Sequence, residues 1–367
     1  MSTAQVSVTW AQALAWRLER QLLAPVGSES VAGVVRRLGA VPSFDESLAE
    51  LAVRVRRSRS RPGELARALA DGTVIKAFTF RGSMHYLAPE EGGAYLTIRA
   101  AGRQWERTSW VEHYRLTAEA WPAFRAAVRD ALTAGPLTVA ELGEALTRHR
   151  EFRHLGPVFD EGAGTLIKPL TWQGDMSLGS PRDGRHTFQR LDTNPQWRVW
   201  TLAEAGPFAV WSYLRSYGPA TREHVHHWLG MLSAGTKRVD GWLAEVADDL
   251  VPVDIEGTTA YVVREDADTL AAARPTQAVR LLPGHDQWVM APGTDDTRVV
   301  PAACRQAVTR KANLILVGGV VRGTWAVRGD DLALTWADDG RSPQAVEEAV
   351  VEEVRRLAEI LGRPRSA

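Results

Sequence analysis

The chain has 367 residues, more than one ordinary hydrophobic core accommodates, so we expect two to four structural units. Its 44 Lys and Arg balance 44 Asp and Glu, so any nucleic-acid binding must rely on a local concentration of basic residues. The one cysteine, Cys304, excludes disulfide scaffolds and cysteine-based zinc sites. No apolar run has the length of a signal peptide or a membrane span, so we expect a cytoplasmic protein.

The first third of the chain predicts helices followed by a hairpin. Apolar residues recur at helical spacing in residues 9–23, and Ser30 is placed to cap a second helix over 31–38. A loop, Val41–Ser47, separates it from a third helix over 47–57. Two short strands then follow, at 74–78 and 84–87. Helices followed by a hairpin are the outline of a winged helix.

The same outline recurs twice further along the chain. Thr138, with Glu141 three residues later, predicts a capping box after Pro136, and strand-like sequence follows at 174–192. Thr221 follows Pro219 in the same way, and strand-like sequence follows at 250–266. We therefore predict three tandem winged helices, with an irregular α+β protein as the alternative.

The residue composition of the sequence changes from about Ala278. Val, Leu and Trp alternate with Gly turns, which predicts a small antiparallel sheet or β-barrel, and an amphipathic helix follows at 343–361. The predicted fold is thus α+β. Its expected domains are winged helix 1 with the catalytic loop (1–112), winged helix 2 (113–202), winged helix 3 (203–275), a β-barrel (276–342) and a C-terminal helix (343–367).

Six segments spread over nearly the whole chain carry a family resemblance. They are ALAWRLERQLL from Ala13, FRGSMHYL from Phe80, LIKPLTWQGDMSLG from Leu166, YGPATREHVHHWLG from Tyr217, LLPGHDQWVMAPG from Leu281 and GGVVRGTW from Gly318. Their order resembles that of the AlkZ/YcaQ group of winged-helix bacterial DNA glycosylases, and they are closer to the AlkZ branch.

The resemblance implies excision of bulky or crosslinking alkylpurine adducts from double-stranded DNA, above all N7-alkylguanines. It also implies self-resistance to a DNA-alkylating natural product. We expect a monofunctional enzyme without cofactor or lyase step, because no lysine lies in the motif loop. We expect a monomer associated with the nucleoid, and little or no flipping of the adducted base.

The chain departs from the family at the catalytic motif. The family carries Gln, an aliphatic or small residue, then Gln or Asp in the loop that corresponds to Val41–Ser47, and gapless alignment places these polar positions at Pro42 and Phe44. Proline has no polar side chain and no backbone N–H, and phenylalanine is apolar. Either the protein has lost catalysis and only binds DNA or sequesters a drug, or the neighbouring Asp45, Glu46 and Ser43 have taken over.

The chemistry allows the second reading. The base leaves an N7-alkylated purine as a neutral molecule, so the enzyme has only to stabilise an oxocarbenium-like sugar and position a water. Asp45 is the leading candidate, with Glu46 and Ser43 in reserve, and the alternative for Asp45 is an N-cap of the third helix. Phe44 and Pro42 are candidates for contact with a large aromatic adduct. The alternative for Phe44 is that it packs in the core and only anchors the loop.

Histidines supply further candidates. His224, His226 and His227 resemble a metal cluster, but residues two apart on a helix face away from each other and no acid lies at ligand spacing, so we predict no metal site. His85 either packs in the core or approaches DNA. His285, Asp286 and Gln287 either face the lesion or form the turn at a strand end; a small-molecule hydrolase centred on His285 and Asp286 is a further alternative.

Basic residues in loops are the candidates for phosphate contacts. They are Arg182, Arg185, Lys237, Arg238, Arg310, Lys311 and Arg322. The alternative for any single one of them is a solvated surface residue.

Overall fold

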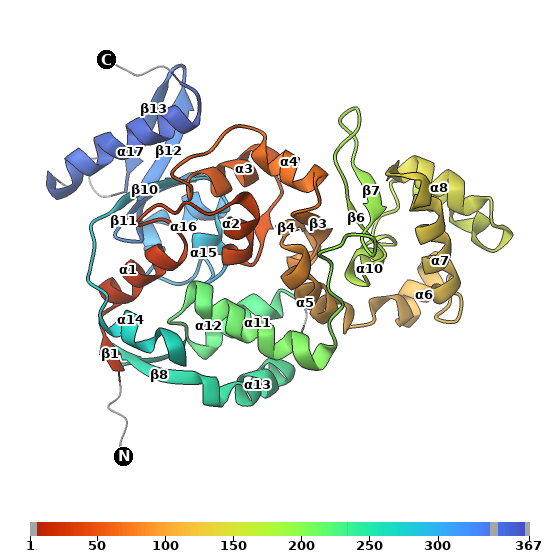
Figure 1. The fold of residues 1–367 in the computed structure, drawn as a ribbon, viewed down its shortest axis with the longest axis horizontal. Helices are drawn as coiled ribbons and strands as arrows, with labels where there is room; N and C mark the ends of the chain where they lie inside the picture. Colours follow the sequence, from red (N-terminus) through yellow and green to blue (C-terminus); the bar gives the residue numbers. More distant parts are fainter. Residues whose placement is uncertain (1–5, 233, 338–343, 364–367) are drawn as a thin grey trace. The chain divides into compact units, whose positions relative to one another are not determined.

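The computed structural model describes residues 6–232, 234–337 and 344–363, and the chain forms two compact units (Figure 1). Unit 1 comprises Met1–Leu65, Val210–Gly230 and Gly235–Ala367. Unit 2 comprises Ala66–Ala209 and Met231–Ala234. The chain passes from one unit to the other within α4 (Glu64–Ala70) and α11 (Leu202–Tyr217), and it returns to unit 2 for Met231–Ala234. The five domain boundaries expected from the sequence stay a prediction.

Unit 1 holds most of the helices, the strands of two sheets and the short strand β2, which belongs to neither of those sheets. Its other helices are α1 (Trp10–Arg20), α2 (Val31–Leu38), α3 (Glu46–Arg54), α12 (Arg222–Gly230), α13 (Thr236–Glu245), α14 (Ala267–Ala271), α15 (Gln287–Met290), α16 (Ala302–Thr309) and α17 (Glu347–Ile360). Its strands are β1 (Val6–Val8), β2 (Val41–Pro42), β8 (Leu250–Ile255), β9 (Thr258–Val263), β10 (Val279–Leu282), β11 (Asn313–Val317), β12 (Val320–Arg328) and β13 (Asp331–Trp336).

Unit 2 is built on neighbouring strands in the order β4-β3-β6-β7-β5. These strands are β3 (Ile75–Phe78), β4 (Met84–Leu87), β5 (Leu137–Thr138), β6 (Met176–Leu178) and β7 (Thr187–Arg190). The helices of unit 2 are α5 (Pro89–Ala100), α6 (Thr108–Tyr114), α7 (Trp121–Ala131), α8 (Val139–Thr147), α9 (Gly156–Asp160) and α10 (Lys168–Trp172). Neighbouring strands in this order pair antiparallel.

Capping residues in the sequence predicted the starts of two helices correctly. The helix expected over 31–38 is α2 with Ser30 as its cap, and the capping box of Thr138 and Glu141 opens α8. The hairpin predicted from the strands at 74–78 and 84–87 is confirmed as β3–β4, and the strand-like segments at 174–192 and 250–266 form the hairpins β6–β7 and β8–β9. Each follows a group of helices, so the chain is a mixed α+β protein, as predicted.

The segment after residue 278 forms an open sheet, so the expected β-barrel is not confirmed. Strands β10-β11-β12-β13 pair antiparallel in that order, and α15 and α16 interrupt a stretch that we expected to be strands. The outer edge of β10 is covered by α17: the N–H of Leu281 donates to the buried carboxylate of Glu353 over 3.0 Å. Because this edge amide already has a hydrogen-bond acceptor on a helix, it does not need a further strand that would close the sheet into a barrel.

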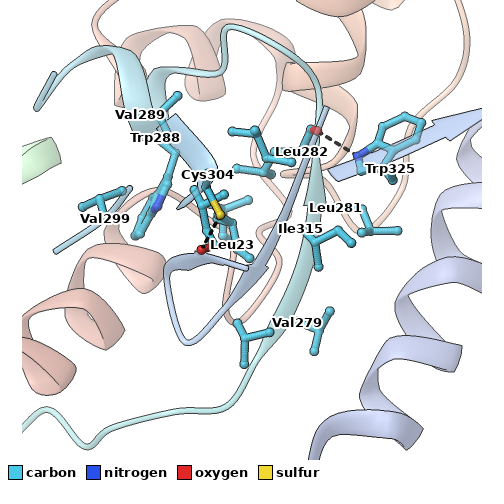
Figure 2. Packing of buried hydrophobic residues seen from close by; sticks show 14 of the residues in the cluster. Leu23, Val279, Leu281, Leu282, Trp288, Val289, Val299, Cys304, Ile315 and Trp325 are labelled. Atoms are coloured by element: carbon cyan, nitrogen blue, oxygen red, sulfur yellow. Dashed lines mark hydrogen bonds between the residues drawn. The ribbon is translucent and has the colours of Figure 1, made fainter. Parts of the chain in front are cut away.

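A large apolar core fills the space between this sheet and the helices that flank it. Leu281, Ile315 and Trp288 are among its fully buried members, and Figure 2 shows them in one cluster with Cys304. The indole N–H of Trp325 donates to the carbonyl of Leu282, which ties β12 to β10. This core fixes the turn that follows β10, and that turn forms part of the site described below.

A second cluster joins the start of the chain to residues about 250 positions later. Strand β1 pairs parallel with β8, so that Val6 faces Val253 (Figure 1). This pairing was not predicted from the sequence, because Val6–Val8 is only three residues long. Within the part of the chain that the structure describes, no helix has both the length and the apolarity to cross a membrane.

Candidate active site

The loop singled out in the sequence has a defined path. Helix α2 ends at Gly39, whose φ of 70° favours a residue without a side chain. The chain then runs through Val41, Pro42 and Ser43, which are all buried, and emerges at Phe44. Extended backbone at Asp45 lets that residue cap α3. The loop is therefore anchored at one end and exposed from Phe44 onward.

Asp45 is the N-cap of α3, which confirms the structural alternative without excluding a chemical role. Its Oδ1 atom accepts from the N–H of Ser47 (2.8 Å), the hydroxyl of Ser47 (2.6 Å) and the N–H of Leu48 (3.3 Å). Within the described parts of the chain, its Oδ2 atom has no hydrogen-bond donor. The carboxylate is largely exposed, and the hydrogen bonds, led by the Ser47 hydroxyl, hold its pKa below the ordinary value. One oxygen holds the helix and the other is available to a substrate.

The two reserve candidates interact with each other. The buried hydroxyl of Ser43 donates to Oε1 of Glu46 over 3.0 Å. Glu46 itself is exposed on the first turn of α3. This contact ties Glu46 back to the loop, so Asp45 presents the freer carboxylate oxygen.

The turn Gly284–Trp288 lies against this loop. A Cβ on Gly284 would lie 2.1 Å from the carbonyl oxygen of Lys311, so only glycine fits there. His285 has a φ of 60°, and its ring meets the ring of Phe44 edge-on, with centroids 5.1 Å apart. Phe44 is 50% exposed, which is unusual for a large apolar side chain and leaves ring area open to a ligand.

A pocket of about 190 Å³ is formed where the loop and the turn meet. Pro42, Phe44, Asp45, His285 and Lys311 contribute to its wall, together with Leu48, Ala52, Gly284 and Asp286. Burial lowers the pKa of His285, and the positive charge of Lys311 lowers it further, so the imidazole is neutral at pH 7. The pocket thus combines an ionised carboxylate, a neutral imidazole, an ammonium group and an exposed aromatic ring.

The two residues after His285 point into the protein. Asp286 is buried against Arg56, and the Gln287 amide N–H donates to the carbonyl of Ala40 over 2.8 Å. Ala40 directly precedes the loop and Arg56 follows α3, so the turn holds both ends of the segment that carries Asp45. In the structure these two side chains position the loop; their predicted contact with substrate stays a prediction.

The other histidine candidates lie in different surroundings. His85 is buried in β4 of unit 2, with its Nδ1 atom 3.1 Å from the carbonyl oxygen of Ser83, and burial lowers its pKa to about 4. His224 pairs with Asp296 and His226 with Asp240. His227 lies against Gly293. Among the described residues no three His, Cys, Asp or Glu side chains come together as metal ligands.

The basic candidates are spread over both units. Arg182 and Arg185 form the tip between β6 and β7, as predicted, and Arg182 pairs with Glu141. Lys237 and Arg238 are exposed on the first turn of α13, and Arg310 and Lys311 are exposed after α16. Arg322 is exposed within β12, whereas we expected it at a hairpin tip; the tip is Gly318–Gly319. Only Lys311 of this group lines the pocket.

Arg56 is a residue of the site that the sequence reasoning missed. It lies four residues after Ala52, in line with the apolar face of the helix predicted over 47–57, which is the one signal that distinguishes it from Arg54 and Arg57. The need for glycine at position 284 was missed as well, because it arises from the backbone of Lys311, which is distant in the sequence.

Comparisons with known proteins agree on one family. Residues 35–360 match the family described as DNA glycosylase AlkZ-like. The chain is 32% identical, over 369 residues and 98% of each chain, to a protein of Streptomyces sahachiroi named interstrand DNA cross-link repair glycosylase. It also matches the structure of Streptomyces sahachiroi DNA glycosylase AlkZ with a TM-score of 0.90, at 32% identity and over 98% of each chain.

Proposed function

Because this chain belongs to the AlkZ-like DNA glycosylase family, we propose that it excises bulky N7-alkylguanine adducts from double-stranded DNA. It is a DNA glycosylase, a hydrolase that acts on N-glycosyl bonds, and its substrate is DNA. The similar protein of Streptomyces sahachiroi is named for the repair of interstrand cross-links, which supports a bulky adduct as the substrate here.

The reaction needs little acid catalysis. An N7-alkylated guanine is cationic, so when the C1′–N9 bond breaks, its electron pair moves to the base and the base leaves neutral. The deoxyribose is left as an oxocarbenium-like cation, and water adds to C1′ and gives up a proton. The transition state therefore gains from a fixed negative charge beside C1′ and from an oriented water.

The observation that carries the proposal is the uncommitted oxygen of Asp45, a residue that lines the pocket. Oδ1 is committed to the cap of α3, while Oδ2 has no donor among the described residues, and Asp45 lines the pocket together with Phe44. The cap also fixes the carboxylate before the substrate arrives, which is the condition for electrostatic preorganisation. We propose that Asp45 stabilises the sugar cation or orients the water, with Glu46 and Ser43 in reserve.

The size of the pocket supports a reaction without full base flipping. At about 190 Å³ it is smaller than the roughly 300–1,000 Å³ of pockets that enclose drug-sized ligands. A sugar edge and a water fit such a space, whereas a guanine with a polycyclic substituent does not. We propose that the adduct stays largely stacked in the duplex and that Phe44 and His285 contact its exposed edge.

The surrounding architecture supports DNA binding. The three groups of helices followed by hairpins are consistent with tandem winged helices, and exposed arginines and lysines lie at loops in both units. We propose that these residues contact phosphates and that the biological role is self-resistance to a DNA-alkylating compound. We further propose a monomeric, nucleoid-associated enzyme.

The test is single-turnover excision by the wild-type protein. A duplex with one bulky N7-alkylguanine should lose that base and leave an abasic site, which mild alkali converts to a strand break, while a matched unmodified duplex stays intact. Pro42 and Phe44 at the family's catalytic positions motivate the competing hypothesis of a DNA-binding or drug-sequestering protein. Tight binding of the adducted duplex with no released base would favour that hypothesis.

A further inference from the structure

A second, basic depression lies at the other end of α3 from the reactive loop. The chain leaves α3 through Arg54 and continues as Val-Arg-Arg-Ser-Arg-Ser-Arg to Arg61. A groove of about 780 Å³ is lined by this segment and by the end of α17. Four arginines line it, Arg57, Arg59, Arg61 and Arg356, against two acidic residues, Glu64 and Glu359. The groove therefore favours an anion.

The backbone of this segment is held in place. The N–H of Ser58 donates to the carbonyl of Gly27 over 2.8 Å, and the N–H of Gly27 donates to the carbonyl of Arg56 over 3.1 Å. Arg54 reaches the hydroxyl of Ser60 over 3.4 Å. A wall that is already ordered loses little entropy when a ligand binds.

Two of the four arginines are engaged within the protein and two are not. Arg57 pairs with Glu64, and Arg356 pairs with Glu353. Arg59 and Arg61 are exposed, and across the described ranges neither side chain has a hydrogen-bond or ion-pair partner. The planar guanidinium group binds a phosphate through two parallel hydrogen bonds, which makes these two side chains suited to a phosphodiester.

The position of the groove relative to the reactive loop limits what the ligand can be. Asp45 caps the first turn of α3 and the groove begins just after its last turn, so the length of the nine-residue helix, about 13 Å, separates them. Phosphates of one DNA strand are spaced about 3.4 Å apart along the helix axis, so this separation corresponds to about four nucleotides. A strand whose lesion lies at Asp45 can therefore present its own backbone to Arg59 and Arg61.

We propose that Arg59 and Arg61 bind the phosphodiester backbone of the damaged strand about three to five nucleotides from the lesion. This inference rests on the proposed function, because the lesion is taken to lie at Asp45. Arg59 and Arg61 were not among the DNA-contact residues predicted from the sequence. Their place in the groove sets the number of nucleotides between the bound phosphate and the lesion.

The first experiment measures the binding of unmodified duplex DNA as a function of salt. Arg59→Gln and Arg61→Gln should each make the slope of log binding constant against log salt shallower by about 0.9, and each should weaken binding about eightfold at 0.1 M salt. The double variant should lose about twice as much slope. Arg274→Gln removes one charge from another exposed position of unit 1 and is the matched control. Slopes equal to that of the wild type would overturn the proposal.

The second experiment tests the register. A neutral methylphosphonate is placed three, four or five nucleotides from an N7-alkylguanine, on either side. It should weaken wild-type binding several-fold at one of these positions and leave the double variant almost unaffected; an equal loss in both proteins at every position would exclude contact there. The release of the damaged base is measured separately and tests the proposed function. If the wild type excises the base but the arginine variants keep the wild-type salt slope, the proposed phosphate contact is wrong and the proposed function stands. If the variants change the salt slope but the wild type releases no base, the proposed function is wrong and the phosphate contact stands.

Discussion

The side chains of Arg56 and Asp286 form a two-pronged ion pair that solvent does not reach. Nη1 lies 2.7 Å from Oδ2 and Nη2 lies 2.6 Å from Oδ1, and both side chains are 0% exposed. Asp286 also accepts the N–H of Trp288, and Arg56 donates to the carbonyl of Ala52. One pair of charges thus connects the end of α3 to the turn that carries His285, and with it fixes the wall of the pocket.

Asp286→Asn should destabilise the protein by about 3 kcal/mol. The amide keeps the shape of the side chain and can still accept from Trp288, but it leaves the guanidinium of Arg56 buried without a counter-charge, which costs about 3–5 kcal/mol when nothing relaxes. Urea unfolding at pH 7 measures the change.

The control is Asp295→Asn. Asp295 also pairs with an arginine, Arg305, but its side chain is 91% exposed, so the loss should stay below about 1 kcal/mol. Equal losses in the two variants would mean that burial of the Arg56–Asp286 pair does not set its contribution.

His85 should make unit 2 less stable in mild acid. Burial lowers the pKa of His85 from 6.5 to about 4, so between these values the unfolded chain binds a proton that the folded chain does not. The contribution of the neutral ring is therefore complete above pH 6.5 and is lost as the pH falls toward 4. Between pH 7 and pH 5 the free energy of unfolding should fall by about 2 kcal/mol because of this residue.

The measurement compares the wild type with His85→Gln at both pH values. The difference between the two proteins isolates His85 from the other titrating groups, since they are common to both. A pH dependence that is the same in both proteins would contradict the assignment.

Phe44→Ala should change substrate preference and leave stability almost unaltered. The ring is half exposed and meets His285 edge-on, so its removal costs the fold about 1 kcal/mol or less. Loss of apolar contact with a large adduct should lower kcat/KM for a polycyclic N7-guanine adduct about tenfold, with little effect on N7-methylguanine.

Val351→Ala is the control for Phe44→Ala, because Val351 is also an exposed apolar residue of unit 1 and lies on α17. Equal losses on both substrates in the Phe44 variant would place the ring outside the substrate contact.

Short-range signals explain how much of this fold was predictable. The cap at Ser30, the capping box at Thr138 and the hairpin after residue 74 each depend on residues within a few positions, and the structure contains all three. The open sheet was not foreseen, because Glu353 covers the edge of β10 from 72 positions away. Pairing between distant segments has no local signature.

The same distinction applies to the site. The sequence and the family resemblance pointed to Val41–Ser47 and, separately, to Gly284–Trp288, and the structure places them against one pocket. Which carboxylate faced inward was not predictable: Asp286 and Asp45 are both acids in turns, yet one is sealed against Arg56 and the other is exposed. The difference arises from an arginine 230 positions away.

Asp45→Asn separates the two roles that the structure allows for Asp45. Asparagine caps helices about as well as aspartate, so the melting temperature and the affinity for DNA should hardly change. The negative charge beside the developing sugar cation is lost, so the single-turnover excision rate should fall by roughly two to three orders of magnitude. Because hydrogen bonds keep the pKa of Asp45 below its ordinary value, the wild-type carboxylate stays ionised above that range, and its titration should add no slope to the rate between pH 5 and pH 8. Glu46→Gln is the comparison variant, since it removes the neighbouring charge from the same helical turn and tests the reserve candidate. A normal rate for Asp45→Asn, together with a large loss for Glu46→Gln, would transfer the role to Glu46; normal rates for both would leave Asp45 as a helix cap alone.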